Sequence, residues 1–478
     1  MREPAPELRR DTEDFQTASH QQFKLFNSAL TLYQRMPNSY EYLKEAADAS
    51  LEIPRDVTDA VRDIVDTVRD DGDEGVRELT EKFDGVQREN LRVTADEIAA
   101  AEETLSEGDR RTIRNTIENV REFHQEQFAN LDGFEREFQD GITLGTRLMP
   151  VERAGVYVPG GRHPLVAAPA MTIVPAIVAG VEEVIACAPP GPDGLPDPAQ
   201  LYAMDQAGAD DIYVAGGAQA ISAMAYGTET IPGVNKITGP GNIYVIEAKR
   251  QAFGQVGIDF LAGPTEVLII CNDTSDPEMV ATDLLAQAEH DPRSRPILVG
   301  TDRETIDATL DAMDAQFPTL RTEDVARQAW DENGEIVLAD DLSTAADVAN
   351  EYAIEHLQVM IDDPRQLMDQ LRDYGSLFLG HHAPVVFGDK AVGTDHTLPT
   401  LEVADYSGGV NVTTYLRVLT HQHLTAEGAD AIAPWAAKIC ELEGTHAHQI
   451  SAEKRIITDD GRDLSRDIDL DTGSDLEL

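Results

Sequence analysis

The chain has 478 residues, of which 41% are hydrophobic and 26% are charged, with 35 glycines and 25 prolines; this composition is typical of a globular protein of two or three domains and excludes fibrous and low-complexity classes. Aspartate and glutamate number 88 against 38 lysines and arginines, and the net charge of −50 disfavours nucleic acid and anionic membranes as partners. Because the acidic residues are spread between apolar segments, we expect an acidic surface on an ordinary fold, suited to a halophilic, salt-rich cytoplasm in which ions screen the repulsion.

The first third of the chain predicts an extension followed by helices. Residues 1–38 are polar and weakly periodic and contain no apolar signal segment, so we expect a flexible extension on a cytoplasmic protein. Between residues 39 and 150 apolar side chains recur at helical spacing, most clearly in 61–83 and 113–128. This pattern predicts a helical lead-in that packs on the domain that follows it.

Short apolar segments alternate with helical patterns after residue 150, which is typical of parallel sheets covered by helices. The pattern is compatible with one barrel or with two open sheets. The expected strands are residues 183–188, 211–215, 236–238, 267–271, 296–300, 335–339, 357–361 and 376–380. From residue 389 the strand signal fades, which predicts a small C-terminal module at 389–455 and an acidic tail at 456–478.

Three glycine-rich turns lie at expected strand-to-helix junctions, at 157–161, 216–219 and 239–242. Glycine lets the backbone approach a ligand closely, and the N-terminus of the next helix offers N–H groups to an anion. Each turn alone could be a plain tight turn, and none has the GxGxxG pattern of ordinary dinucleotide sites. Their recurrence at equivalent junctions favours a ligand site.

Two pairs of polar side chains in the second half of the chain are candidates for chemistry. Gln287 and His290 lie three residues apart on one face of an expected helix, a spacing that allows metal binding and also fits an ordinary surface pair. Glu355 and His356 precede the expected strand at 357–361. An imidazole beside a carboxylate suits proton transfer, although the pair could be incidental at a helix end.

Two C-terminal segments add further candidates. Asp389 and His396 lie in a glycine-rich segment of irregular backbone, and Glu443 and His448 follow the last expected helix. The three cysteines, at 187, 271 and 440, are widely scattered, so neither a disulfide framework nor a thiolate metal site is expected.

These segments together resemble the histidinol dehydrogenase family from about residue 40 to residue 450. The similarity is carried by nine motifs in order, namely YVPGG, GGAQAI, MAYGTE, GPGN with EAKR, IDFLAGP, DLLAQAEHD, EHL, GDKAVGTDHTLPT and EGTHAH. The resemblance implies an NAD-dependent enzyme that oxidises a primary alcohol, L-histidinol in the family's own reaction, through an aldehyde to a carboxylate. It implies an α/β fold with two open, mostly parallel Rossmann-like sheets covered by helices. The dinucleotide would bind at 151–265, and the metal and catalytic residues would lie at 266–388.

The resemblance also implies an intertwined homodimer and roles for individual residues. Zinc would be held by Gln287, His290, Asp389 and, from the partner subunit, His448; manganese is conceivable for such nitrogen and oxygen donors. His356 matches the general base, and Glu355 matches the acid that activates water for the second oxidation. The substrate contacts would be Thr265, His396 and Glu443, together with His356 and the four metal ligands. The dinucleotide contacts would be Tyr157, Gln219 and Asn242.

Several positions depart from the family pattern. Lys390 stands where Tyr is usual, Thr265 where Ser is common, and Asp395 where Asn precedes the histidine. Arg162 follows the first glycine pair and could bind an anionic group of the substrate. These features resemble the sulfopropanediol dehydrogenase branch, so an anionic diol such as 2,3-dihydroxypropane-1-sulfonate is the alternative substrate. A non-catalytic, two-lobed ligand-binding protein is the alternative from another class.

Overall fold

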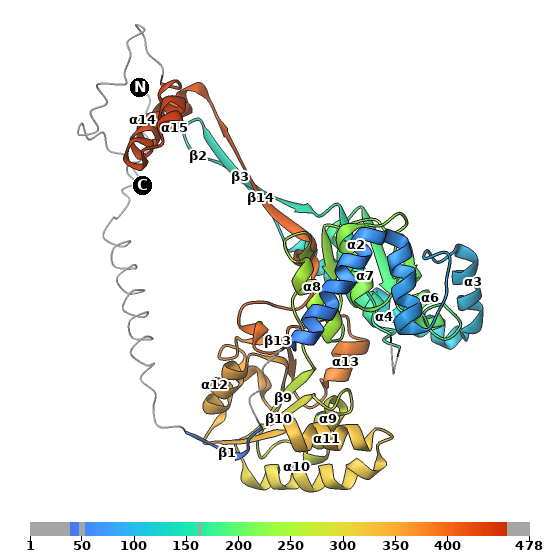
Figure 1. Cartoon of the computed structure of the whole chain (residues 1–478). Coiled ribbons are helices and arrows are strands. Elements are labelled where there is room, and N and C mark those ends of the chain that lie inside the picture. The colour runs from blue at the N-terminus through green and yellow to red at the C-terminus, as the bar shows by residue number, and fades with distance from the viewer. Residues whose placement is uncertain (1–38, 47–52, 161–163, 457–478) are drawn as a thin grey trace. The chain divides into compact units, whose positions relative to one another are not determined.

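The structure, a computed structural model, describes residues 39–46, 53–160 and 164–456. The described residues divide into two compact units, one with residues 39–46 and 264–382 and the other with residues 53–160, 164–263 and 383–456 (Figure 1). The expected N-terminal extension, the expected acidic tail beyond residue 456, and Arg162 lie outside the described residues.

The first unit contains a six-stranded sheet in the order β1-β11-β10-β9-β12-β13. Strand β1 pairs antiparallel with β11 at one edge, and the other neighbouring strands are parallel. The central strands are buried along their length because helices cover the sheet, which explains their continuous apolar sequences. The strands are β1 Tyr40–Lys44, β9 Glu266–Cys271, β10 Arg295–Gly300, β11 Glu335–Ala339, β12 Ile354–Met360 and β13 Tyr374–Leu379. The helices are α9 Pro277–Ala288, α10 Arg303–Gln316, α11 Glu323–Asn333 and α12 Leu342–Tyr352.

The connection between α12 and β12 is a single residue. Helix α12 ends at Tyr352 and β12 begins at Ile354, with Ala353 between them. Ala353 has φ of 41° and ψ of 53°, the left-handed conformation that favours glycine, and it is 3% exposed. The turn therefore carries backbone strain directly before the strand that holds the candidate acid and base.

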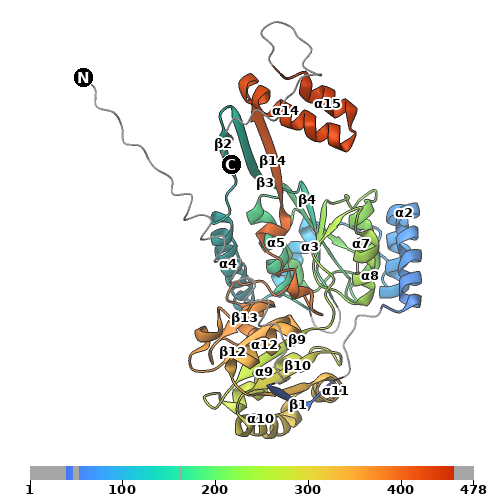
Figure 2. The ribbon, with the colours of Figure 1, turned by 90° about the vertical axis from the view of Figure 1, so that its left-hand side faces the viewer.

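The second unit contains a five-stranded parallel sheet in the order β6-β5-β4-β7-β8. One apolar cluster packs α4, α5 and α6 against this sheet, and another packs α2, α7 and α8. Figure 2 shows α7 and α8 between the sheet and α2. The strands are β4 Arg153–Tyr157, β5 Glu183–Ala188, β6 Asp211–Val214, β7 Lys236–Thr238 and β8 Gly257–Ile258. The helices are α2 Arg55–Asp84, α3 Ala95–Thr104, α4 Glu107–Ala129, α5 Ala168–Ala179, α6 Pro198–Ala207, α7 Gly217–Tyr226, α8 Ile243–Ala252 and α13 Val385–Lys390.

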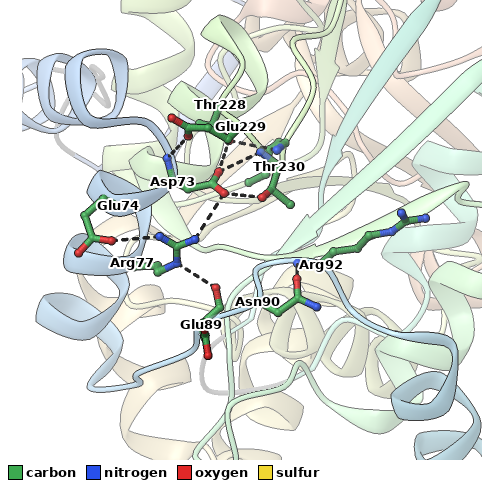
Figure 3. Close-up of polar contacts among 10 residues, drawn as sticks. Asp73, Glu74, Arg77, Glu89, Asn90, Arg92, Thr228, Glu229 and Thr230 are labelled. Carbon is green, nitrogen blue, oxygen red and sulfur yellow. Dashed lines mark hydrogen bonds and ion pairs between the residues drawn. The ribbon is translucent and has the colours of Figure 1, made fainter.

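A kink inside α2 is held by a loop that follows α7. Gly72 has φ of 59° within the helix, and the next residue, Asp73, is 6% exposed. Its carboxylate accepts hydrogen bonds from the Thr228 hydroxyl at 2.6 Å and from Thr230, and its N–H donates to Glu229 (Figure 3). Burial opposes ionisation, but these bonds and the charge of Arg77 outweigh it and lower the pKa of Asp73.

A three-stranded antiparallel ribbon in the order β14-β3-β2 projects from the second unit and carries two helices at its far end (Figures 1 and 2). Its outer strands are largely exposed. His421 on β14 and Glu135 on β2 both lie opposite Gly145 on β3, and their side chains pair above this glycine at 2.6 Å. The elements are β2 Phe134–Gln139, β3 Ile142–Pro150, β14 Leu416–Leu424, α14 Ala426–Glu443 and α15 His446–Glu453.

The predicted fold class is confirmed, because both large sheets are open and mostly parallel. The helical expectation for residues 39–150 holds only in part, since this region also contains β1, β2 and β3. The fading of strands after residue 389 is wrong, because β14 is nine residues long. Strands β2 and β14 are largely exposed and β1 and β3 are only partly buried, so these strands lack the apolar pattern of a buried strand.

Candidate functional site

The candidate acid and base lie inside strand β12 rather than before it. Glu355 and His356 are 7% and 2% exposed. His356 Nδ1 lies 2.9 Å from the carbonyl oxygen of Glu266 and 3.3 Å from Glu355 Oε2. A carbonyl oxygen only accepts hydrogen bonds, so Nδ1 carries a hydrogen and Nε2 is the basic nitrogen of the neutral ring.

A threonine hydroxyl joins Glu355 to a candidate metal ligand. Thr265, directly before β9, donates its hydroxyl hydrogen to Glu355 Oε2 at 2.7 Å, and the N–H of Glu266 donates to the same oxygen at 2.7 Å. Gln287, in the last turn of α9 and 3% exposed, donates from Nε2 to the Thr265 hydroxyl oxygen. The first unit therefore brings together Thr265, Gln287, Glu355 and His356.

Three charged residues at the starts of neighbouring strands support this group. Arg295 opens β10 and donates to Glu266 Oε1 at 2.9 Å and to Glu335 Oε1 at 3.0 Å. Glu266 and Glu335 open β9 and β11 and are 0% and 6% exposed. The Tyr352 hydroxyl donates to Glu335 Oε2 at 2.8 Å. Removal of one partner would leave a buried charge unpaired, so these residues hold the strand ends in place.

Sequence reasoning missed this ion-paired group, although the sequence contained a signal for it. Glu266, Arg295 and Glu335 each stand at the first position of an otherwise apolar strand. In parallel neighbours such positions meet at one edge of the sheet, so their opposite charges predict ion pairs.

His290 lies just beyond the end of α9 and is exposed. It stands three residues from Gln287, as the sequence indicated, but the helix itself ends at Ala288. The intervening Glu289 accepts a hydrogen bond from the Thr322 hydroxyl at 2.7 Å. Glu289 is thus engaged with α11's N-cap residue.

A large pocket lies in the second unit beside the glycine-rich turns. Its volume is about 1240 Å³. Tyr157, Gln219 and Asn242, the three predicted dinucleotide contacts, all line it, together with Gly160 and Gly217 of the turns. The sequence did not single out other lining segments, which come from α2 and its C-terminus and from the proline-rich loop at 189–198.

The pocket residues are held by specific contacts. Tyr157 is 4% exposed and its hydroxyl accepts from the N–H of Gly217 at 3.1 Å; burial raises its pKa to about 12. Gln219 lies in the first turn of α7 and is 3% exposed. Asn242 caps α8, accepting from the N–H groups of Tyr244 and Val245 at 3.0 and 3.2 Å. The first residue of α7, Gly217, and the N-cap residue of α8, Asn242, therefore both line the pocket.

One glycine in these turns is required by close packing. Gly239 has φ of 117°, and a Cβ atom there would overlap the carbonyl oxygen of Tyr157. The backbones of the first and third glycine-rich turns thus touch, which no larger residue would permit.

Asp389 and His396 form a local arrangement in the second unit. Asp389 lies near the end of α13 and is 9% exposed, and its backbone carbonyl lies 2.8 Å from His396 Nδ1. The Lys390 ammonium lies 3.9 Å from the Asp389 carboxylate. The loop thus holds the two predicted site residues together, with the backbone of one orienting the ring of the other.

Asp395, the residue before His396, is 9% exposed. One carboxylate oxygen accepts from the N–H of Thr397 at 2.6 Å, and within the described residues the other has no hydrogen-bond partner. Burial, with the nearby carboxylates of Asp259 and Asp389, raises the pKa of Asp395 well above its usual range, against the hydrogen bonds from Thr397. A protonated carboxyl group at this position could donate one hydrogen bond in addition to accepting them.

Glu443 and His448 lie on the helices at the far end of the ribbon. Glu443 ends α14, His448 lies in α15, and both are exposed (Figure 2). Gln287 and His290 belong to the first unit, whereas Asp389 and His448 belong to the second. Across the described part of the chain, no three histidine, cysteine, aspartate or glutamate side chains are grouped closely enough to hold a metal ion.

Comparison with known proteins identifies the family. A model of the histidinol dehydrogenase family matches residues 48–456. The chain belongs to the histidinol dehydrogenase family. The expected resemblance is therefore confirmed, and the chain is an oxidoreductase that acts on alcohol and aldehyde groups, which sets aside the non-catalytic binding protein.

Relatives in this family carry two different substrate names. A histidinol dehydrogenase homolog of Shouchella clausii is 46% identical over 386 residues, covering 81% of this chain and 91% of the relative. Histidinol dehydrogenase of Methanothermobacter thermautotrophicus is 41% identical over 424 residues, covering 89% and 97%. Sulfopropanediol 3-dehydrogenase of Ruegeria pomeroyi is 40% identical over 418 residues, covering 87% and 96%.

A solved structure shows the same fold. The crystal structure of histidinol dehydrogenase from Elizabethkingia anophelis matches with a TM-score of 0.82 at 35% identity, covering 86% of this chain and 94% of that one. Within the described residues, no helix combines the length and the apolar character needed to cross a membrane.

Proposed function

We propose that this chain is a zinc-dependent and NAD-dependent dehydrogenase that oxidises a primary alcohol through an aldehyde to a carboxylate, with L-histidinol as substrate. The observation that carries the proposal is a buried group in which Glu355 of β12 contacts His356 and Thr265, and Thr265 contacts Gln287. An acid and a base fixed at one sheet position suit a reaction that removes protons from an alcohol and then from water.

His356 serves as the general base of this proposal. Its Nδ1 hydrogen is directed to the carbonyl of Glu266, so Nε2 is the atom that takes the proton of the substrate hydroxyl. In the second oxidation, water adds to the aldehyde carbon and Glu355 accepts the proton of that water. Bound NAD would accept one hydride in each of the two oxidations, and the product is the carboxylate.

NAD is assigned to the pocket of the second unit. The volume of about 1240 Å³ and the lining by Tyr157, Gln219 and Asn242 support a large, partly polar ligand. The N-terminus of α7 borders the pocket at Gly217, and helix N-termini favour the phosphate groups of a dinucleotide.

Zinc is assigned to Gln287, His290, Asp389 and His448 of the partner subunit. Two imidazoles, a carboxylate and an amide oxygen form a donor set that suits zinc, with manganese as the alternative metal. The Nε2 of Gln287 is used by Thr265, so the amide oxygen is the atom available to a cation. Bound zinc would anchor and orient the substrate as a Lewis acid.

A homodimer is part of this proposal. Glu443 lies on α14 and His448 on α15, at the end of the ribbon remote from the five-stranded sheet (Figures 1 and 2). Exposed apolar side chains recur along α14 at Ile432, Trp435, Ile439 and Leu442. A second chain would cover such a face and take these residues into its own site. We also assign the protein to a salt-rich cytoplasm on the basis of its charge.

An anionic diol such as 2,3-dihydroxypropane-1-sulfonate is the second candidate substrate. Its support is the relative named sulfopropanediol 3-dehydrogenase, which is almost as similar to this chain as the histidinol dehydrogenase of Methanothermobacter thermautotrophicus. Lys390 beside Asp389 adds a cation near a proposed zinc ligand, which would favour an anionic substrate. Arg162 would contribute a second cation.

The test is a substrate panel with the full-length protein in molar KCl. NADH formation is followed by absorbance with histidinol, dihydroxypropanesulfonate and simple primary alcohols, each with NAD and with zinc or a chelator. We expect two NADH per histidinol and loss of the activity with the chelator. Preference for the sulfonate would select the second candidate, and no NADH with any alcohol would refute the proposal.

A further inference from the structure

We propose that Thr265 is a positioning residue whose single hydroxyl orients both the amide of Gln287 and the carboxylate of Glu355. The inference rests on the proposed function and adds to it, because it assigns Thr265 a role between two protein side chains. It couples the proposed zinc ligand to the proposed acid through one oxygen atom.

The hydroxyl of Thr265 stands between one donor and one acceptor. It donates its only hydrogen to Glu355 Oε2 at 2.7 Å and accepts a hydrogen from Nε2 of Gln287. A hydroxyl has one hydrogen and two lone pairs, so both bonds form at the same time. Their direction runs from amide to hydroxyl to carboxylate.

This direction sets which atom Gln287 offers to a cation. With Nε2 committed to Thr265, the amide turns its oxygen away from the threonine. A flipped amide would direct Oε1 at the hydroxyl and compete with Glu355 for its only hydrogen. Since an amide oxygen binds metal ions and an amide NH₂ group does not, the bond from Thr265 to Glu355 favours the metal-binding orientation of Gln287.

The same hydroxyl fixes Glu355. Oxygen Oε2 receives hydrogens from two consecutive residues, the hydroxyl of Thr265 and the N–H of Glu266, both at 2.7 Å. Two such donors hold one carboxylate oxygen in a defined place. The other oxygen, Oε1, is then left in a defined direction for a proton that arrives from water.

Thr265 is itself anchored. Its carbonyl oxygen accepts from the backbone N–H of Arg295 at 3.0 Å, at the position where β9 and β10 begin. The side chain of Arg295 continues to Glu266 and Glu335. The backbone of Thr265 is thus held at the strand ends that Arg295, Glu266 and Glu335 connect. This fixed position lets its hydroxyl orient the side chains of Gln287 and Glu355.

The test compares Thr265→Val, which keeps the shape and removes the hydroxyl, with Thr265→Ser, which keeps the hydroxyl. Zinc affinity of the metal-free, full-length dimer is measured by competition with a chromogenic chelator. Loss of a residue that orients a metal ligand typically weakens binding by about 10- to 100-fold, and we expect this for Thr265→Val. Thr265→Ser should remain within about threefold of the native protein.

A second readout separates positioning from general stability. Thr282, exposed on α9, supplies the matched control, because its hydroxyl bonds to Glu278 and Gln316 and to neither Gln287 nor Glu355. Thr282→Val should bind zinc as the native chain does. Thermal unfolding of all three variants is measured in parallel, and a Thr265→Val variant that melts normally but binds zinc weakly supports the proposal.

A double-mutant comparison tests whether Thr265 and Glu355 act together on zinc affinity. In a background of Glu355→Gln, which removes the acceptor, Thr265→Val should cost less zinc affinity than it does alone, because the two residues act through one chain of hydrogen bonds. Equal losses in both backgrounds, or native affinity in Thr265→Val, would overturn the inference. A native protein that neither binds zinc nor reduces NAD would instead refute the proposed function.

Discussion

The six-stranded sheet of the first unit and the ribbon of the second carry their candidate residues in opposite ways. On β12, Glu355 and His356 are less than a tenth exposed and have partners within their own unit. On the ribbon, Glu443 and His448 are exposed on helices that extend beyond the second unit's five-stranded sheet (Figure 2). The first pair has its contacts within one unit of one chain, whereas the second pair is proposed to act in the site of a partner chain.

The largest effect is expected where the support is most complete. His356→Asn removes the basic nitrogen and should lower kcat by about 10²- to 10⁴-fold, the usual contribution of a general base. Steady-state NADH formation with saturating alcohol measures it. His381, another histidine of this unit that lies 3.3 Å from Asp362, supplies the control, and His381→Asn should retain native kcat. Comparable losses in both variants would contradict a specific role for His356.

The second prediction tests whether His448, on the helices of the ribbon, contributes to the site of a partner chain. His448→Ala should lower activity and zinc affinity by about 10- to 100-fold, although the residue is exposed in one chain. Co-expression of His448→Ala with His356→Asn chains forms mixed dimers in which one site has both native residues. About one quarter of native activity should return for random pairing of two subunits. Activity no higher than that of either variant alone would show that the ribbon does not complete a partner's site.

The third prediction concerns the buried acid in the loop between α13 and the ribbon. The raised pKa of Asp395 means that the folded chain holds its proton more tightly than the unfolded chain does. The free energy of unfolding therefore falls as pH rises from the ordinary pKa of an aspartate to the raised one. Asp395→Asn cannot ionise, so it should be more stable than the native chain at pH 8, with the difference shrinking toward pH 4.

Denaturant unfolding at fixed high salt, repeated across this pH range, measures the Asp395 effect. Asp405→Asn supplies a control on the same segment, since Asp405 is exposed and its substitution should change the free energy of unfolding by less than about 0.5 kcal/mol. A native chain whose stability does not fall relative to Asp395→Asn as pH rises would contradict the buried, protonated acid.

The smallest effect is expected on the ribbon surface. The His421 and Glu135 side chains are 33% and 65% exposed, and exposed ion pairs contribute between zero and about 1 kcal/mol. His421→Gln should therefore change the free energy of unfolding by less than about 1 kcal/mol and leave kcat unchanged. Thermal unfolding and NADH assays measure both, and a larger loss would mean that this pair supports an interface.

Sequence patterns predicted the buried sheets because their strands are continuous apolar segments. They failed for β1, β2, β3 and β14, whose residues are exposed or only partly buried and do not form a continuous apolar segment. Glu355 and His356 could be recognised as a pair, but their place inside β12 could not, because two ionisable residues are unusual in a buried strand.

The partners of the candidate residues were harder to predict than the residues themselves. Thr265 and Glu355 are 90 positions apart, and Arg295 meets Glu335 across 40 positions. Such contacts depend on strand order, which periodicity does not specify. Arg162 and the roles of the chain ends beyond residues 39–456 stay predictions, as these parts lie outside the described residues.

The one-residue turn at Ala353 ties the position of β12 closely to that of α12. A rotation or translation of α12 would also move Glu355 and His356, because only one residue separates the helix from the strand. A short glycine insertion after Ala353 would decouple the two elements, and it would also shift the alternation of side chains along the strand. A change in the length of this connection should therefore displace Glu355 and His356.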